Sequence, residues 1–184
     1  MRIYVVALVL TVLVLCGSPL RATTFAPADF SQLVLAARAI AHGRIIEVRP
    51  QLADGRRRVE TLVTLQVATY LKGSLGPTVV FRVPGGQVGR YRTIVLDAPH
   101  FSAGDEVVLL LGARGPSVPY VLGMSQGVYR ISGDPVSGER RVIPAPLQGE
   151  GTEWKRVVRG DPARRPMLLT EFARSVQAVL GGQP

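Results

Sequence analysis

Apolar and polar residues alternate along much of the chain, which is typical of half-buried antiparallel strands. The clearest case is VETLVTLQVATY at residues 59–70. Its expected buried face consists of Val59, Thr61, Val63, Leu65, Val67 and Thr69. Further segments with strand character lie at 41–48, 78–83, 91–96, 120–122 and 128–131. The apolar run EVVLLL at 106–111 predicts a buried central strand.

Two segments have the spacing of a helix. FSQLVLAARAIA at residues 30–41 predicts a short helix, with Asp29 or Ser31 as its N-cap, that passes into the first strand. MLLTEFARSVQAVL at residues 167–180 predicts an amphipathic helix. Short strands separated by glycine-bearing turns favour a barrel or sandwich over an α/β sheet. The predicted fold is therefore mainly β: one OB-like antiparallel barrel of five to seven strands, flanked by an N-terminal and a C-terminal helix.

The pattern divides the chain into four parts. Residues 1–22 resemble a signal peptide, with Arg2 before an apolar run and a break at residues 17–22. A β-barrel domain is expected at 23–133, an extended segment rich in Pro, Gly and Arg at 134–166, and the helix and tail at 167–184. The expected location is periplasmic or extracellular. The single cysteine, Cys16, lies inside the signal, so the mature protein would have no disulfide.

Composition and charge narrow the class of partner. The chain has 184 residues, 47% of them hydrophobic, and a net charge of +9. Removing Arg2 and Arg21 leaves 20 basic against 13 acidic residues, a net charge of +7. Such a charge favours acidic partners or anionic lipid. Export argues against nucleic acid, so a protein or an envelope component is the expected partner. Peripheral contact with a membrane stays open, and the sequence does not indicate an oligomeric state.

The glycine stretch Pro84–Gly89 (PGGQVG) is not expected to bind phosphate. It lacks the Lys-Ser/Thr of a P-loop and the spacing of GxGxxG, and a strand follows it where phosphate loops lead into a helix. Glycine supplies positive φ in hairpins and bulges. We therefore expect a hairpin or a bulge here.

The segment Gly123–Gly127 (GMSQG) matches the GxSxG pattern of a serine-hydrolase nucleophile elbow. That elbow needs a helix after the serine and a histidine downstream, whereas a strand is expected after Gly127 and both histidines lie upstream. The order His42, Asp97, Ser125 is that of chymotrypsin, but that architecture uses two barrels. A turn between strands is the expected structure. The alternative is a small envelope serine hydrolase using Ser125 with His42 or His100.

Two other clusters carry polar chemistry. Asp97, His100, Asp105 and Glu106 could ligate a metal, but their spacing is not diagnostic and turn-forming residues surround them. We expect surface loops and no metal or cofactor. Trp154, followed by Lys155, Arg156 and Arg159, could form an exposed patch or pin the extended segment to the barrel.

The strands also carry a family resemblance. Residues 39–48, 65–73 and 79–81, in which one strand ends in Lys-Gly, resemble netrin-like modules such as the amino-terminal domain of tissue inhibitors of metalloproteinases. The segment Ala98–Val107 is similar to an element of uncharacterised exported bacterial proteins. The likeness covers roughly residues 30–131 and implies a five-stranded OB-type barrel. Inhibitors of that family place an amino-terminal cysteine on the target zinc, which this chain lacks, so the inhibitory site does not transfer.

The sequence thus predicts an exported binding module without catalytic residues. Its binding loops are expected at 84–92, 97–105 and around Trp154, because loops on a rigid barrel carry function. The candidate binding residues are Gln87, Arg90, Arg92, His100 and Trp154. Inhibition of an exported metalloprotease, implied only by the resemblance, is a further alternative.

Overall fold

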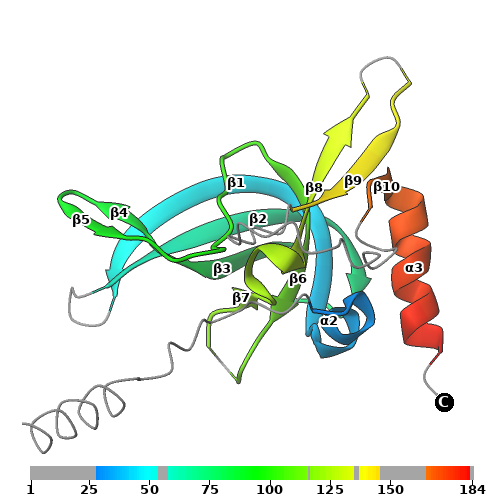
Figure 1. The fold of residues 1–184 in the computed structure, drawn as a ribbon, viewed down its shortest axis with the longest axis horizontal. Helices are drawn as coiled ribbons and strands as arrows, with labels where there is room; N and C mark the ends of the chain where they lie inside the picture. Colours follow the sequence, from blue (N-terminus) through cyan, green and yellow to red (C-terminus); the bar gives the residue numbers. More distant parts are fainter. Residues whose placement is uncertain (1–27, 54–57, 116, 135–136, 146–164, 183–184) are drawn as a thin grey trace, which may run out of the picture.

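The computed structural model describes residues 28–53, 58–115, 117–134, 137–145 and 165–182. The described chain is mainly β, with a large mixed sheet and two α-helices (Figure 1). The helices and strands, in chain order, are α2 (Phe30–Ala36), β1 (Ala39–Ala53), β2 (Arg58–Lys72), β3 (Thr78–Pro84), β4 (Gly86–Val88), β5 (Tyr91–Thr93), β6 (Glu106–Gly112), β7 (Tyr120–Val121), the 3₁₀ turn η2 (Met124–Gly127), β8 (Val128–Gly133), β9 (Arg140–Pro144), β10 (Met167–Leu168) and α3 (Leu169–Gly181).

Strand β1 is paired along both edges. It runs antiparallel to β2 on one side and, over Ala39–Arg44, antiparallel to β6 on the other. Strand β2 pairs with β3, β3 pairs with β7, and β7 pairs with β6. The pairings therefore lead from β1 through β2, β3, β7 and β6 back to β1. The β3–β7 contact, Arg82 opposite Tyr120, is parallel, so the prediction of a wholly antiparallel arrangement is wrong at this pair.

Three strands extend the sheet beyond β6, in the order β8, β9, β10. Strands β8 and β9 form a hairpin that projects at the upper right of Figure 1. Strands β4 and β5 form a second hairpin and a separate two-stranded sheet, at the left of the same view. The hairpin expected at the glycine stretch is thus present.

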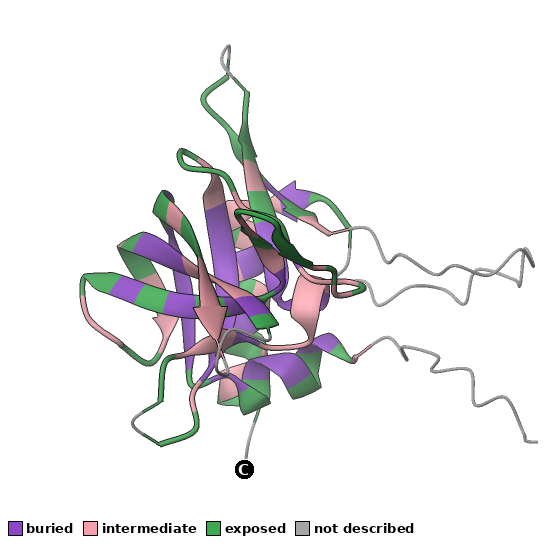
Figure 2. Ribbon diagram, turned by 90° about the vertical axis from the view of Figure 1, so that its left-hand side faces the viewer, coloured by how far each residue is buried: buried purple, intermediate pink, exposed green. Residues whose placement is uncertain are grey.

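Two hydrophobic cores lie on opposite faces of β1 and β6. In β6, Val107, Leu109 and Leu111 belong to the inner core, which β2 and β3 complete. Val108 and Leu110 belong to the outer core, which α2, α3 and β9 cover. The residue alternation of a strand produces this division. All five residues are fully buried (Figure 2), as the prediction of a central strand requires.

The outer core joins segments that are far apart in sequence. Phe30 of α2 packs edge to face against Phe172 of α3, with ring centroids 5.6 Å apart, and Tyr129 of β8 lies 4.7 Å from the same ring. Val142 of β9 is buried in the same cluster. The C-terminal helix α3 is therefore packed onto the sheet, and β9 contributes Val142 to the core between them. Aromatic rings in such arrangements add to the stability that their buried area provides.

The first helix ends earlier than the sequence predicts. Asp29 caps its start by accepting a hydrogen bond from the Ser31 amide (2.7 Å), but the helix stops at Ala36. The Arg38 amide already donates to the Leu111 carbonyl of β6 (2.8 Å). Pairing with the central strand thus overrides helical propensity over the last residues of the predicted helix.

Lys72 and Gly73 hold α2 against the end of β2. The Lys72 ammonium donates to the carbonyls of Val34 and Leu35, each at 2.8 Å, and so satisfies two carbonyl groups near the helix end. Desolvation lowers the pKa of Lys72 below its usual value. Gly73 has φ +60°, and a Cβ there would lie 2.3 Å from the Arg38 carbonyl oxygen. The Lys-Gly pair therefore has a structural role.

The predicted buried face of β2 is correct only in part. Val59, Val63 and Leu65 are buried, but Thr69 is exposed. The register with β1 skips Ala68, so Tyr70 and not Thr69 contacts the inner core. A β-bulge reverses the facing of every residue after it.

Several predictions fall outside the described residues. These are the signal peptide and most of the extended segment, Trp154 included. Neither α2 nor α3 has the length and apolar character that a bilayer-crossing helix needs, and no other helix in the described part of the chain has them.

The close packing at Gly73 gives a stability prediction. Gly73→Ala should lower the free energy of unfolding by about 3 kcal/mol or more, because positive φ and a backbone clash act together. Gly89→Ala is the matched control, since Gly89 has φ +56° and no atom lies within 4 Å of the position that a Cβ would take. The control should lose about 1–2 kcal/mol. Urea denaturation of both variants measures the difference, and equal losses would contradict the clash.

Candidate functional site

The β4–β5 hairpin, residues 86–93, projects from the sheet and is called the wing below. Gly85 (φ +91°) and Gly86 (φ +134°) turn the chain out of β3, and a Cβ on Gly86 would lie 2.6 Å from the Thr61 hydroxyl. Thr61 donates to the Gly85 carbonyl (2.8 Å), and the Val59 amide donates to the Thr93 hydroxyl (3.0 Å). Glycine conformations and hydrogen bonds to β2 therefore fix the base of the wing.

The chain from residue 94 to residue 105, called the rim loop below, connects the wing to β6. Two cavities lie beside the wing base and the start of this loop, with volumes of about 600 and about 340 Å³. Both cavities share lining residues from the end of β3, from β5 and from the rim loop. The residues that line both cavities are Val83, Pro84, Gly85, Thr93, Val95 and Pro99.

Three of the predicted binding residues come together at the smaller cavity. Gln87 and Arg92 of the wing and His100 of the rim loop all line it. Arg90 lies at the turn of the wing, where its guanidinium sits 5.2 Å from the Tyr91 ring centre and donates to the Tyr91 hydroxyl (3.1 Å). The fifth residue, Trp154, lies outside the described residues.

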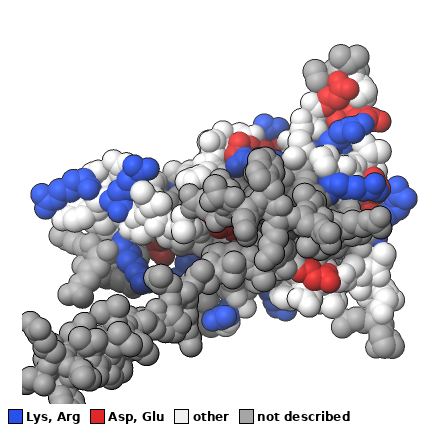
Figure 3. Space-filling view, in the orientation of Figure 1, with Lys and Arg blue, Asp and Glu red and all other residues white. Residues whose placement is uncertain are grey.

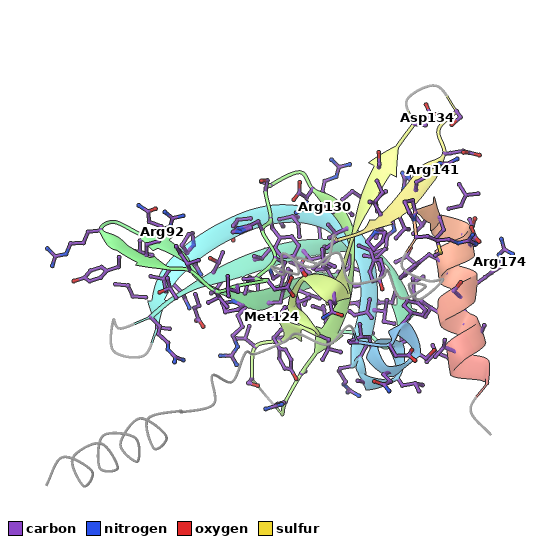
Figure 4. All side chains as sticks on the ribbon, viewed as in Figure 1. Arg92, Met124, Arg130, Asp134, Arg141 and Arg174 are labelled. Carbon is purple, nitrogen blue, oxygen red and sulfur yellow. The ribbon has the colours of Figure 1, made fainter. Side chains whose placement is uncertain are left out.

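The larger cavity contains side chains that the sequence did not indicate. Arg58, Glu60 and Arg82 line it from β2 and β3, and Tyr120 and Met124 line it from the opposite side. Arg82 and Tyr120 are neighbours only through the parallel β3–β7 pair. Figure 4 labels Met124 near the centre of the molecule and Arg92 on the wing. No local sequence signal could have joined these residues.

Ser125 lies in η2 and is held to the rim loop. Its hydroxyl donates to the Asp97 carboxylate, and its amide donates to the Asp97 carbonyl (3.1 Å). Asp97 (φ +60°) and Met124 (φ +57°) both adopt the left-handed region, which is uncommon outside glycine. Strand β8 begins at Val128, directly after η2. The prediction of a turn between strands is confirmed.

A third cavity, of about 430 Å³, brings together residues of the hydrolase alternative. Asp97, His100 and Ser125 all line it. In a serine–histidine–aspartate triad the imidazole stands between hydroxyl and carboxylate. Here the hydroxyl donates directly to the carboxylate, and the His100 carbonyl accepts from the Arg130 guanidinium. This hydrogen bonding joins η2 to the rim loop.

His42 belongs to a different cluster. It is buried, and its Nε2 lies 2.8 Å from Glu106 Oε1, to which Arg140 Nη1 also bonds at 3.2 Å. These residues line a cavity of about 360 Å³ together with Arg44 and Gln66. Among the described residues, none lines both this cavity and that of Ser125. The structure thus places Asp97 beside Ser125 and His42 beside Glu106.

The acidic residues of the rim loop bond to the loop itself and to the neighbouring η2 and β8. The Asp105 carboxylate accepts from the Ser102 amide (2.9 Å) and pairs with Arg130 (2.8 Å). Within the described ranges, no group of three or more His, Cys, Asp or Glu side chains is placed to hold a metal ion.

Comparison with known proteins adds no relative: no protein-family model, curated protein or solved structure matches the chain. The resemblance to netrin-like modules stays a prediction from the sequence. The geometry of the chain itself is therefore the basis for a functional proposal.

The contact between Ser125 and Asp97 gives a second prediction. Ser125→Ala should lower the free energy of unfolding by about 1–2 kcal/mol, since a hydrogen bond to a charged group is lost. It should also speed amide hydrogen exchange across residues 94–99, because the rim loop loses its link to η2. Ser132→Ala, at an exposed position of β8, is the control. Unchanged exchange in the rim loop would contradict this structural role.

Proposed function

We propose that this protein is a non-enzymatic binding module built on a five-stranded OB-like barrel, and that the wing end is its binding surface. The circuit of pairings through β1, β2, β3, β7 and β6 supports the barrel. OB-folds are partly open five-stranded barrels that bind ligands through loops and an exposed strand face.

One observation carries the proposal: two cavities adjoin the same backbone at the wing base, and Gln87, Arg92 and His100 converge on one of them. Concave sites with an apolar lining and a few convergent polar groups are the usual binding sites of proteins. Arg92 and Gln87 provide donors for anionic or carbonyl groups. The proposed ligand is a protein segment or another envelope component.

A ¹⁵N-labelled full chain titrated with a delipidated envelope extract tests the proposal. Amide shifts should concentrate at residues 82–100. The triple variant Gln87→Ala, Arg92→Ser, His100→Ser should lose them, whereas Arg174→Ser, at the opposite end of the molecule in Figure 4, should keep them. Shifts that survive the triple variant, or that centre on α3, would overturn the proposed site.

A serine hydrolase is the second candidate, because Asp97, His100 and Ser125 line one cavity. The binding-module proposal expects no covalent labelling by a fluorophosphonate probe, since the Ser125 hydroxyl donates directly to a carboxylate, which is a weak base. Mass spectrometry of the treated protein measures the label. Labelling of the wild type that Ser125→Ala abolishes would favour the hydrolase instead.

A further inference from the structure

Exposed and half-buried residues alternate from Arg92 to Leu96, at the end of the wing and the start of the rim loop. Thr93 bonds to β2 and, like Val95, lines both cavities at the wing base. The residues between and around them, Arg90, Arg92, Ile94 and Leu96, are exposed. These four exposed residues, called the stripe below, follow one another from the turn of the wing to the start of the rim loop. Arg92 and Ile94 also border the smaller cavity, and Ile94 and Leu96 border the third.

The apolar half of the stripe is unusually exposed. Ile94 is 73% exposed and Leu96 is 74% exposed, the highest values among the large apolar residues of the described chain. Tyr91, beside them in the wing, is 44% exposed. Single exposed apolar residues are ordinary, but neighbouring ones rimmed by polar groups mark an interaction site.

The other half of the stripe is basic. Between Thr61 and Leu96 the chain contains Lys72, Arg82, Arg90 and Arg92 and no acidic residue. Figure 3 shows lysine and arginine side chains gathered over the wing end of the molecule. A partner of complementary charge is therefore anionic.

We infer that the stripe docks this protein on a membrane surface that carries anionic phospholipids. Ile94 and Leu96 enter the boundary between headgroups and acyl chains, Arg90 and Arg92 contact lipid phosphates, and the Tyr91 ring lies at the interface. A soluble polyanion would need the arginines alone, and an uncharged apolar partner would need only the aliphatic residues. Exposed arginines followed directly by exposed aliphatic residues match a surface that is charged outside and apolar beneath.

The backbone around the stripe is held in place from both sides. The Thr93 hydroxyl accepts from the Val59 amide at the wing base, and Asp97 is bonded to Ser125 of η2 immediately after Leu96. The stripe thus needs little ordering on binding, which favours association. This inference deepens the proposed function and rests on it, since it assigns a membrane to the outward side of the same wing end.

Vesicle sedimentation with the purified full chain tests the inference. The protein should bind vesicles of phosphatidylcholine with about 30% phosphatidylglycerol and bind pure phosphatidylcholine much less, and added salt should weaken binding. Arg90→Ser with Arg92→Ser should reduce the partition coefficient roughly tenfold or more. Ile94→Ser with Leu96→Ser should reduce it by a similar factor.

Two matched controls distinguish an effect of the stripe from a general effect of lost positive charge or lost exposed apolar surface. Arg141→Ser with Arg174→Ser removes the same charge at the far end of the molecule (Figure 4) and should leave vesicle binding within about twofold of wild type. Leu35→Ser changes an exposed leucine of α2 and should also leave it unchanged. Equal losses in the control pair and the stripe pair would overturn the inference.

A fluorescent reporter tests insertion directly. In a Cys16→Ser background, Leu96→Cys labelled with an environment-sensitive dye should brighten on anionic vesicles, whereas the same dye at Arg174→Cys should not. A different result would point to a site for soluble polyanions: the arginine pair loses vesicle binding, the Ile94/Leu96 pair keeps it, and the dye does not brighten. That result would overturn the inference that the stripe docks on a membrane. Absence of vesicle binding would overturn the inference while leaving the delipidated-extract experiment to decide the proposed cavity site.

Discussion

The double pairing of β1 is the constraint on which the rest of the molecule depends. Over Ile40–Arg44 this strand pairs with β2 and β6 at once, and its alternating residues, such as Ile40 and Ala41, enter opposite cores. Ile45 exchanges backbone hydrogen bonds with Gly104 and Asp105 of the rim loop, and beyond it β2 is the strand that pairs with β1 in the described structure. Val48 and Pro50 of that second half line the smaller cavity beside the wing. The strand thus joins a buried, helix-covered end to the end that carries the cavities beside the wing.

The glycine clusters that resemble reaction centres in the sequence serve backbone geometry in the structure. Gly73 lets β2 approach the chain before β1, and Gly85 and Gly86 turn the wing away from β3. Gly127 has no room for a Cβ, which would lie 2.1 Å from the Leu122 carbonyl oxygen. Glycine is suited to such positions because it has no side chain to clash. Chain packing therefore accounts for the glycine at position 127 of the GxSxG match.

Local patterns predicted most of the elements, and contacts between distant segments produced the differences. Strand β6, the wing hairpin and the helix α3 follow from periodicity and turn residues, each of which acts over a few positions. The bulge at Ala68 and the parallel β3–β7 pair depend on how strands meet after folding. The bonds from Ser125 to Asp97 and from His42 to Glu106 span 28 and 64 residues. Gln87, Arg92 and His100, three of the predicted binding residues, do converge on one cavity. They lie on two loops close together in sequence, both of which the turn residues predicted.

The proposed roles of the wing end follow from one extended segment. Thr93 and Val95 line both cavities at the wing base, and Arg90 and Leu96 beside them are exposed, so one short stretch of backbone serves two proposed surfaces. Because both surfaces share this backbone, a ligand in the cavities and a membrane against the stripe act on the same few torsion angles. The bond between Ser125 and Asp97 then limits how far either event can displace the chain. On this view the serine matters to binding through the position of the rim loop rather than through its nucleophilicity.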